Sequence, residues 1–435
     1  MKYYSLTNSY NTASFSEAVI QGLAPDRGLY FPESIPKLSD DFWSSFPDKS
    51  MVEIGVDVMR PFVGGTIPDS RLQEIVADTL CFDFPVKKIS NSISTLELFH
   101  GPTMAFKDVG GRFMARCIGY FNEKSPKKVT VLVATSGDTG GAVASGFLGI
   151  PGTEVIILYP KGKVSRIQEL QLTTNGQNIK AIEIDGVFDD CQEMVKSAFI
   201  DEDLKARLNL TSANSINVAR WLPQSLYFFA AVQQLQRIGI DKKLVFSVPS
   251  GNFGNICAGI VAKQLGLPIS HFVASTNSND TVPRYLKTED YLPHPSKQTI
   301  SNAMDVGNPS NFIRIQSLYN RDFNVLKKEF SSRAYSDRKT KEALAEIYKK
   351  YNYIADPHGA VGYLGLQNFL KENPEHYGVF LETAHPIKFR DIVEETLSLE
   401  LSIPAQIQHI LDKTPEKTSL SGYEAFKEYL LSHTA

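Results

Sequence analysis

The sequence lacks any run of about 18 uncharged apolar residues, the length that a membrane-spanning helix requires. Its opening, MKYYSLTN, lacks the apolar segment of a secretory signal peptide. Cysteine is scarce, and the 4 cysteines form no C-x-x-C pair and no spacing with histidine that suits zinc. These absences predict a soluble, cytoplasmic protein with reduced thiols, no membrane partner and no metal site.

An excess of charge of one sign is also lacking. Lys and Arg number 45, Asp and Glu number 48, and the formal net charge is -3. This balance gives no support for nucleic acid as a partner, because nucleic acid requires a strongly basic surface. Small anions stay open as ligands, since a local cluster of donors is enough to bind one.

Familiar catalytic motifs are missing as well. The sequence contains no G-x-x-x-x-G-K-[ST] loop, no G-x-G-x-x-G, no H-E-x-x-H and no G-x-S-x-G. The usual sequence signals for nucleotide binding, zinc peptidases and serine hydrolases are therefore absent.

What is present is a chain of 435 residues, 42% of them hydrophobic, enough for roughly three domain-sized units. From about residue 128, apolar β-branched runs alternate with helical periodicity, which indicates an α/β fold with parallel sheets covered by helices. In such sheets, ligands bind beyond the carboxyl ends of the strands. The runs predict strands at 128–134, 154–159, 179–184, 243–248 and 270–275. The stretches between them predict helices at 141–147, 165–174, 189–199, 222–235 and 255–265.

Two glycine-rich turns each lie between a predicted strand and a predicted helix. Residues 135–141 read TSGDTGG, and residues 250–255 read SGNFGN. Glycine lets a ligand approach the backbone closely, and the free N–H groups at a helix start favour a phosphate or a carboxylate. Two such turns suggest two anionic groups. The alternative, two ordinary strand-to-helix turns, stays open at this point.

A third feature is the segment FHGPTMAFKD at residues 99–108, in which Lys107 begins an amphipathic helix. Apolar neighbours and a positive helix start both disfavour a charged lysine, so they lower its pKa from about 10.4. A lysine amine with a lowered pKa suits Schiff-base chemistry. The alternative is a solvated lysine paired with Asp108.

These features together resemble the threonine synthase family of pyridoxal-phosphate enzymes. The resemblance rests on FHGPTMAFKDVGG at 99–111 and continues along nearly the whole chain. The further motifs are QGLAPDRGLYFPESIP at 21–36, ATSGDTG at 134–140, SANSINVAR at 212–220, VPSGNFGN at 248–255, SNAMDVGNPSN at 301–311 and TAHPIKF at 383–389.

The resemblance implies fold type II of the pyridoxal-phosphate enzymes, with two helix-covered subdomains built on parallel or mixed sheets. An N-terminal region would span residues 1–90 and the catalytic core residues 91–390. Within the core, the smaller subdomain would take about 112–230 and the larger about 91–111 together with 231–390. A short helical tail would occupy 391–435.

By the same resemblance, Lys107 would hold pyridoxal 5'-phosphate covalently and act as the mobile acid and base. Asp138 would lie near the cofactor's 3'-oxygen, and the Thr383 hydroxyl would meet the pyridine nitrogen. The cofactor phosphate would lie on the second glycine-rich turn, which consists of Ser250, Gly251, Asn252, Phe253, Gly254 and Asn255.

The implied substrate is O-phospho-L-homoserine. Arg220 suits its phosphate, because a planar guanidinium can donate two parallel hydrogen bonds. Without the family, Arg220 would be a surface arginine of a helix, and Asn214 and Ser215 would cap the start of that helix. The residues implied to bind the substrate are Thr135, Ser136, Thr139, Asn214, Ser215 and Arg220.

The implied activity is γ-elimination of phosphate followed by addition of water at Cβ, which gives L-threonine. One alternative is a phospholyase that releases 2-oxobutyrate from the same substrate, and another is a non-catalytic binding protein of the same fold. The family further implies a monomer or a small homo-oligomer. We expect packing and hydrogen-bonding roles for His100, His358 and His385, because no metal-ligand spacing links them.

Overall fold

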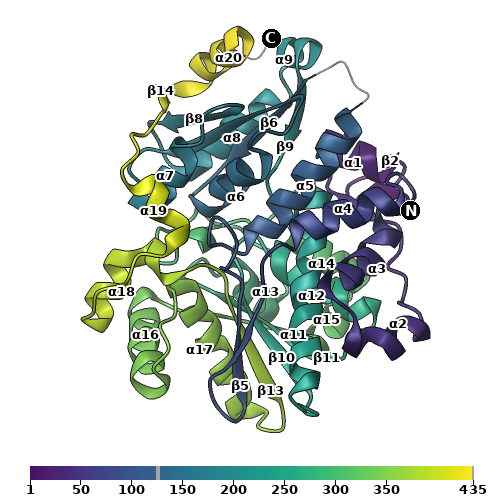
Figure 1. Ribbon diagram of the computed structural model, residues 1–435, viewed down its shortest axis with the longest axis vertical. Helices are drawn as coiled ribbons and strands as arrows, with labels where there is room; N and C mark the ends of the chain where they lie inside the picture. The colour runs from purple at the N-terminus through teal and green to yellow at the C-terminus, as the bar shows by residue number, and fades with distance from the viewer. Residues whose placement is uncertain (124–127, 434–435) are drawn as a thin grey trace.

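The computed structural model describes residues 1–123 and 128–433. Two helix-covered sheets follow one another along the long axis of the molecule, and the N-terminal helices lie against one side (Figure 1). Among the described residues, no helix is both long and apolar enough to cross a membrane.

One sheet has five strands, all parallel, in the order β14-β8-β7-β6-β9. Every residue of β7 is buried, as expected for a central strand covered on both faces. The strands are β6 (Val129–Ala134), β7 (Thr153–Pro160), β8 (Ile179–Ile184), β9 (Asn209–Ser212) and β14 (Thr418–Leu420). The helices beside it are α6 (Asp138–Phe147), α7 (Arg166–Thr173), α8 (Phe188–Ala198), α9 (Glu202–Arg207), α19 (Ala405–Leu411) and α20 (Gly422–His433).

The other sheet has six strands in the order β12-β11-β10-β13-β5-β4, parallel except for the edge pair β4–β5. Its strands are β4 (Val86–Lys88), β5 (Ile93–Glu97), β10 (Leu244–Pro249), β11 (Ile269–Thr276), β12 (Phe330–Ala334) and β13 (Tyr377–Glu382). The elements between residues 107 and 304 that surround or join the two sheets are α5 (Lys107–Asn122), α10 (Val218–Trp221), η2 (Leu222–Ser225), α11 (Leu226–Arg237), α12 (Gly254–Leu265), α13 (Thr281–Thr288) and η3 (Asn302–Met304). Those that follow are α14 (Phe312–Leu318), α15 (Phe323–Glu329), α16 (Asp337–Tyr351), α17 (Pro357–Glu372), η4 (Pro386–Phe389) and α18 (Arg390–Leu397).

The predicted α/β class and the five predicted strands are confirmed. The strand predicted at 179–184 has the same bounds in the structure, and the other four agree to within one residue at each end. The single helix predicted at 222–235 is wrong. The chain there forms η2 over residues 222–225 and then α11 from residue 226, and the short helix α10 precedes both. Pro223 lies in the first turn of η2, where its missing N–H interrupts α-helical hydrogen bonding.

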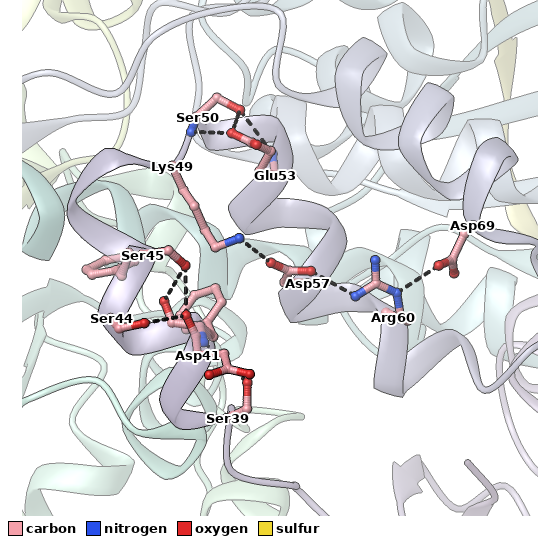
Figure 2. A network of polar contacts seen from close by, with 12 residues as sticks. Ser39, Asp41, Ser44, Ser45, Lys49, Ser50, Glu53, Asp57, Arg60 and Asp69 are labelled. Carbon is pink, nitrogen blue, oxygen red and sulfur yellow. Dashed lines mark hydrogen bonds and ion pairs between the residues drawn. The ribbon is translucent and has the colours of Figure 1, made fainter.

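The N-terminal region forms a small antiparallel sheet and a group of helices. Figure 2 shows a chain of ion pairs that joins these helices: Lys49 to Asp57 at 3.0 Å, Asp57 to Arg60 at 2.8 Å and Arg60 to Asp69 at 3.0 Å. The pairs are partly exposed, so each stabilises the region by only about 0.2–1 kcal/mol. The elements are β1 (Tyr3–Ser5), β2 (Thr12–Ala13), β3 (Tyr30–Pro32), α1 (Phe15–Gln21), α2 (Asp40–Ser45), η1 (Phe46–Asp48), α3 (Met51–Val63) and α4 (Asp69–Thr79).

Buried contacts attach the N-terminal region to the rest of the chain more firmly. Phe31 stacks on Trp221 with the ring centroids 6.0 Å apart. The amide of Asn217 donates to the Val19 carbonyl at 2.8 Å, and the hydroxyl of Thr211 donates to the same oxygen at 3.1 Å. The N-terminal region therefore packs directly on the segment that carries α10.

Helices α5 and α6 approach each other closely, and glycines make this possible. A Cβ on Gly111 of α5 would lie 2.5 Å from the Ala142 carbonyl oxygen of α6. A Cβ on Gly146 would lie 2.8 Å from the Gly111 backbone. Since Lys107 begins α5 and Asp138 begins α6, this contact fixes the spacing of these two residues.

We expect Gly111→Ala to destabilise the protein by about 1–3 kcal/mol, because the added methyl group must displace backbone atoms. Gly119→Ala on the same helix is the matched control. Its Cβ would lie 3.2 Å from a side-chain methyl group of Ile150, and alanine improves helix propensity by up to about 1 kcal/mol. Urea unfolding measures both variants. Equal stability of the two would contradict the close-contact argument.

Candidate active site

A cavity lies between the two sheets, where several helices begin. It receives residues from the starts of α5, α6 and α12 and from the loop before α10. The predicted site residues that line it are Lys107, Ser136, Asp138, Thr139, Asn214, Ser215, Arg220, Gly251, Asn252, Phe253, Gly254, Asn255 and Thr383.

Two predicted site residues do not line the cavity, because the turns themselves use their polar groups. The Thr135 hydroxyl accepts hydrogen bonds from Gly137 N at 2.9 Å and Gly140 N at 2.8 Å. The Ser250 hydroxyl donates to the Val248 carbonyl at 2.8 Å, and its N–H donates to the Ser275 carbonyl at 2.9 Å. Both residues shape the glycine-rich turns from behind.

The second glycine-rich turn has a backbone that few residue types allow. A Cβ on Gly251 would lie 2.8 Å from Met304 Cα and 2.9 Å from the Ala303 carbonyl oxygen. Phe253, the cap of α12, has a left-handed φ of 62°. This geometry brings the start of α12 to the cavity, where the unpaired N–H groups of its first turn favour an anion.

The Lys107 side chain borders the cavity and is therefore partly exposed. The cavity itself lies within the protein, so protein atoms still surround the amine. Burial lowers the pKa of its amine to about 8. The Asp138 carboxylate opposes this shift, whereas the Lys388 and Arg220 cations reinforce it. Lys107 therefore carries an uncharged amine far more often near neutral pH than an exposed lysine does. The alternative reading, a solvated lysine paired with Asp108, is wrong, since Asp108 is buried and accepts hydrogen bonds from Thr103.

Asp138 forms a buried ion pair with Lys388, with 2.7 Å between Oδ1 and Nζ. The Gln168 amide also donates to Asp138 Oδ1, at 3.0 Å. Burial alone would raise the pKa of this carboxyl, but Lys388 and then Lys107 outweigh it and hold the pKa well below its usual value. Asp138 is therefore ionised at neutral pH.

The sequence analysis missed Lys388, although it lies within the TAHPIKF motif. A lysine between Ile387 and Phe389 is a weak signal of burial, and the sequence alone does not show that Asp138 is its partner. In the structure the Lys388 side chain is fully buried. Besides Asp138, its ammonium donates to the Thr103 carbonyl at 2.9 Å.

Arg220 is buried beside the cavity, so the alternative of a surface arginine is wrong. Among the described residues, its Nε and one terminal nitrogen have no hydrogen-bond partner. Burial lowers the pKa of the guanidinium to about 10, so it is still charged at neutral pH. Buried charged groups without partners are costly, so these free donors indicate an anion site.

Asn214 and Ser215 precede the helix but do not cap it, because the cap of α10 is Asn217. The Asn214 amide donates to the Ala134 carbonyl at 2.7 Å and so fixes the end of β6. The Ser215 hydroxyl accepts from the amide of Asn311 at 3.1 Å. Both side chains thus line the cavity and also hold its wall.

A second buried arginine, Arg314, was also missed. It donates to the carbonyl oxygens of Tyr30 at 3.0 Å, Ser215 at 3.1 Å and Ile216 at 2.5 Å. These contacts join the N-terminal region, the loop before α10 and α14. No local pattern in the sequence distinguishes this arginine from one on a helix surface.

Thr383 lies at the cavity directly after β13, and its carbonyl accepts from Phe106 N at 2.9 Å. His358 also lies there: its Nδ1 contacts Asp356 at 2.6 Å, and its Nε2 accepts from Ala303 N at 3.2 Å. His358 thus holds the cavity wall by hydrogen bonds, in line with the role expected for it.

The other two motif histidines also make local contacts. His100 contacts Glu97 at 2.8 Å, and His385 accepts from Ile387 N at 3.1 Å. Burial lowers the pKa of His385 to about 4, so it is neutral at physiological pH. Within residues 1–123 and 128–433, no group of three or more His, Cys, Asp or Glu side chains is arranged to hold a metal ion.

The chain matches three protein-family models in succession. Residues 2–80 match "Threonine synthase N terminus", residues 92–380 match "Pyridoxal-phosphate dependent enzyme", and residues 359–430 match "Threonine synthase, C-terminal". The second of these alone covers more than half of the chain.

Individual relatives and solved structures agree with these matches. The threonine synthase of Escherichia coli is 43% identical over 434 residues, which cover 100% of both chains, and its crystal structure superposes with a TM-score of 0.93. The threonine synthase of Serratia marcescens is 45% identical over 404 residues, 93% of this chain and 92% of that protein. A pyridoxal-phosphate-bound threonine synthase from Brucella melitensis is 35% identical, with a TM-score of 0.92 over 99% of this chain and 98% of that one. The geometry of the cavity and this similarity along the full chain lead to one assignment: the chain belongs to the threonine synthase family of pyridoxal-phosphate-dependent enzymes.

Proposed function

We propose that the chain is a threonine synthase that converts O-phospho-L-homoserine and water to L-threonine and phosphate with pyridoxal 5'-phosphate as cofactor. One observation carries the proposal. A lysine amine with a lowered pKa lies at the same cavity as a buried arginine, two nitrogens of which have no hydrogen-bond partner among the described residues. An aldehyde cofactor requires such an amine, and a phosphorylated substrate requires such an arginine.

The residues of the cavity fit pyridoxal phosphate. Lys107 offers the amine that its aldehyde needs, and the first turn of α12 offers backbone N–H groups for its phosphate. Thr383 supplies a neutral hydroxyl for the pyridine nitrogen. Asp138 and Thr383 approach the cavity from different elements, α6 and the end of β13, so a flat ring can be held between them.

When bound, the cofactor supplies an electron sink that stabilises a carbanion next to the substrate's amino nitrogen. Residues of the chain carry out the proton transfers. Lys107 takes a proton from the substrate's α-carbon on its amine nitrogen and later returns one, which its lowered pKa permits near neutral pH. Among the described residues, Lys107 is the lysine that lines the cavity and it forms no ion pair, so its nitrogen can move between these tasks.

Arg220 would bind the substrate phosphate with its two free donors. Ser136, Thr139, Asn214 and Ser215 line the same cavity and would complete the proposed phosphate site. A charged donor in a buried site binds a phosphate more strongly than the same donor in water. The same contacts would stabilise the negative charge that grows on the phosphate as it leaves.

The two alternatives have less support. A non-catalytic binding protein does not need Lys107 or the burial that lowers its pKa. A phospholyase that releases 2-oxobutyrate would use the same substrate and the same arginine, so only its product separates it from a threonine synthase. The family matches over the full chain favour the synthase.

We propose further that the chain acts in the cytoplasm as a monomer or a small homo-oligomer. Light scattering on purified protein measures its mass.

We also propose that residues 1–90, 91–390 and 391–435 are its structural regions, with subdomains at about 112–230 and at 91–111 plus 231–390. The five-stranded sheet lies mainly within the first of these subdomains and the six-stranded sheet mainly within the second, which supports this division.

We expect purified protein loaded with pyridoxal phosphate to show visible absorption that borohydride removes. Peptide mass spectrometry should then find the reduced cofactor on Lys107. Lys107→Ala should carry no label and lose at least about 1,000-fold in turnover, because among the described residues that line the cavity there is no second lysine to replace it. A label on a different lysine would contradict the assignment of Lys107.

We expect the wild-type protein to release phosphate and L-threonine in equal amounts from O-phospho-L-homoserine. Coupled phosphate detection and amino-acid chromatography measure both products. Phosphate accompanied by 2-oxobutyrate would instead establish the phospholyase. Release of neither product by the loaded protein would rule out both enzymes.

We expect Arg220→Lys to raise KM for O-phospho-L-homoserine by roughly tenfold to hundredfold. Lysine keeps the charge but loses the paired donors, and a hydrogen bond between charged groups is worth about 1.5–3 kcal/mol. Arg112→Lys is the matched control, since Arg112 pairs with Asp78 at 2.9 Å and does not line the cavity. An unchanged KM in Arg220→Lys would remove Arg220 from the proposed phosphate site.

A further inference from the structure

The reaction proposed above does not use the ion pair between Lys388 and Asp138. Both side chains are buried, and the two charged atoms lie 2.7 Å apart. Ion pairs are rarely this deeply buried, because removing two charges from water is energetically costly. The position of this pair beside the cavity is therefore informative.

Lys388 reaches the cavity wall from η4 and holds two segments at once. Its ammonium contacts Asp138 at the start of α6 and donates to the Thr103 carbonyl in the segment that leads to Lys107. That segment has further contacts with the neighbours of Lys388. The His385 N–H donates to the Met104 carbonyl at 3.1 Å. Lys388 thus belongs to the frame that positions the Lys107 amine.

The charges around Lys107 give the ion pair between Lys388 and Asp138 an electrostatic role as well as a structural one. Asp138 and Arg220 line the same cavity as Lys107, Lys388 contacts Asp138, and all three charges act on the Lys107 amine. Lys388 also acts electrostatically on Asp108 and His385, but Asp108 accepts hydrogen bonds from Thr103 and His385 is neutral. If Asp138 had no other partner, its carboxylate would attract the protonated form of Lys107. Among the described residues, the ion-pair partner of Asp138 is Lys388.

We propose that Lys388 is a positioning residue that, by occupying Asp138, prevents this carboxylate from holding Lys107 in its protonated form. The proposal rests on the proposed function, in which Lys107 must exchange protons at its nitrogen. It also explains how an ionised carboxylate can lie beside the expected 3'-oxygen of the cofactor: the Lys388 cation balances the negative charge.

The test is a pH titration of the visible absorption of the loaded protein, which reports protonation of the nitrogen that joins Lys107 to the cofactor. Lys388→Met keeps the length of the side chain but removes its charge. We expect it to raise the midpoint by at least about 1 pH unit, because Asp138 then acts on the nitrogen as an unbalanced opposite charge. Lys388→Arg keeps the charge and should leave the midpoint near that of the wild type.

Two further variants separate this electrostatic role from a structural one. The double variant Lys388→Met with Asp138→Asn removes both charges, so its midpoint should return toward the wild-type value. Lys417→Met is the matched control. Lys417 pairs with Glu169 at 2.8 Å and Glu183 at 2.7 Å, outside the cavity, and its loss should leave the midpoint unchanged.

A wild-type midpoint in Lys388→Met would overturn the proposal, even if that variant is less stable. A double variant that matches Lys388→Met would show that Lys388 does not act through Asp138. If Lys388→Met does not retain cofactor, the pH dependence of Lys107 acetylation in cofactor-free protein, read by mass spectrometry, decides in its place. The same acetylation measurement applies if the wild type binds no pyridoxal phosphate, an outcome that contradicts the proposed function but not the charge arrangement.

Discussion

The rest of the structure depends on one electrostatic constraint: positive charge is gathered in and beside one cavity between the two sheets. Lys107, Arg220 and Lys388 all contribute to it, and the starts of α5, α6 and α12 add the partial charges of their N–H groups. Asp138 balances part of this charge. Burial lowers the pKa values of Lys107 and Arg220, and the Lys388 and Arg220 cations lower that of Lys107 further. The donors of Arg220 that lack partners need a bound anion to be satisfied. A protein with a net charge of -3 therefore has a local cluster of positive charge at this cavity.

The fold maintains this arrangement through contacts between distant parts of the chain. The close approach of Gly111 and Ala142 fixes α5 against α6. Arg314 joins the N-terminal strand β3 to the loop before α10, and so links a region without cavity residues to the wall that carries Arg220. Lys388 joins α6 to the segment before Lys107. The first contact is close packing of two helix backbones and the other two are buried polar contacts, so each has a specific geometry, and together they fix the walls of the cavity.

Much of the fold could be predicted from the sequence, because local patterns determine much of it. The run that forms β8 has the β-branched residue isoleucine at three of its six positions, and its bounds were predicted without error. Elements that depend on distant partners were missed: β5 pairs with β13 almost 300 residues away in the chain, and β14 has only three residues and depends on β8. The same distinction holds for the site. Motif residues such as Lys107 and Arg220 were predicted, and both lie at the cavity. Lys388 and Arg314 were not, because only the folded chain brings their partners to them.

The last strand, β14, has a consequence for how the protein is made. It covers the outer edge of β8, and the residues that form it lie near the C-terminal end of the chain. During synthesis, β8 leaves the ribosome more than 200 residues before its neighbour does. Throughout that interval the edge of the five-stranded sheet exposes unpaired N–H and C=O groups, which are a template for pairing with other chains. A nascent or shortened chain that ends before β14 therefore carries an aggregation-prone edge that the finished protein covers with its own tail.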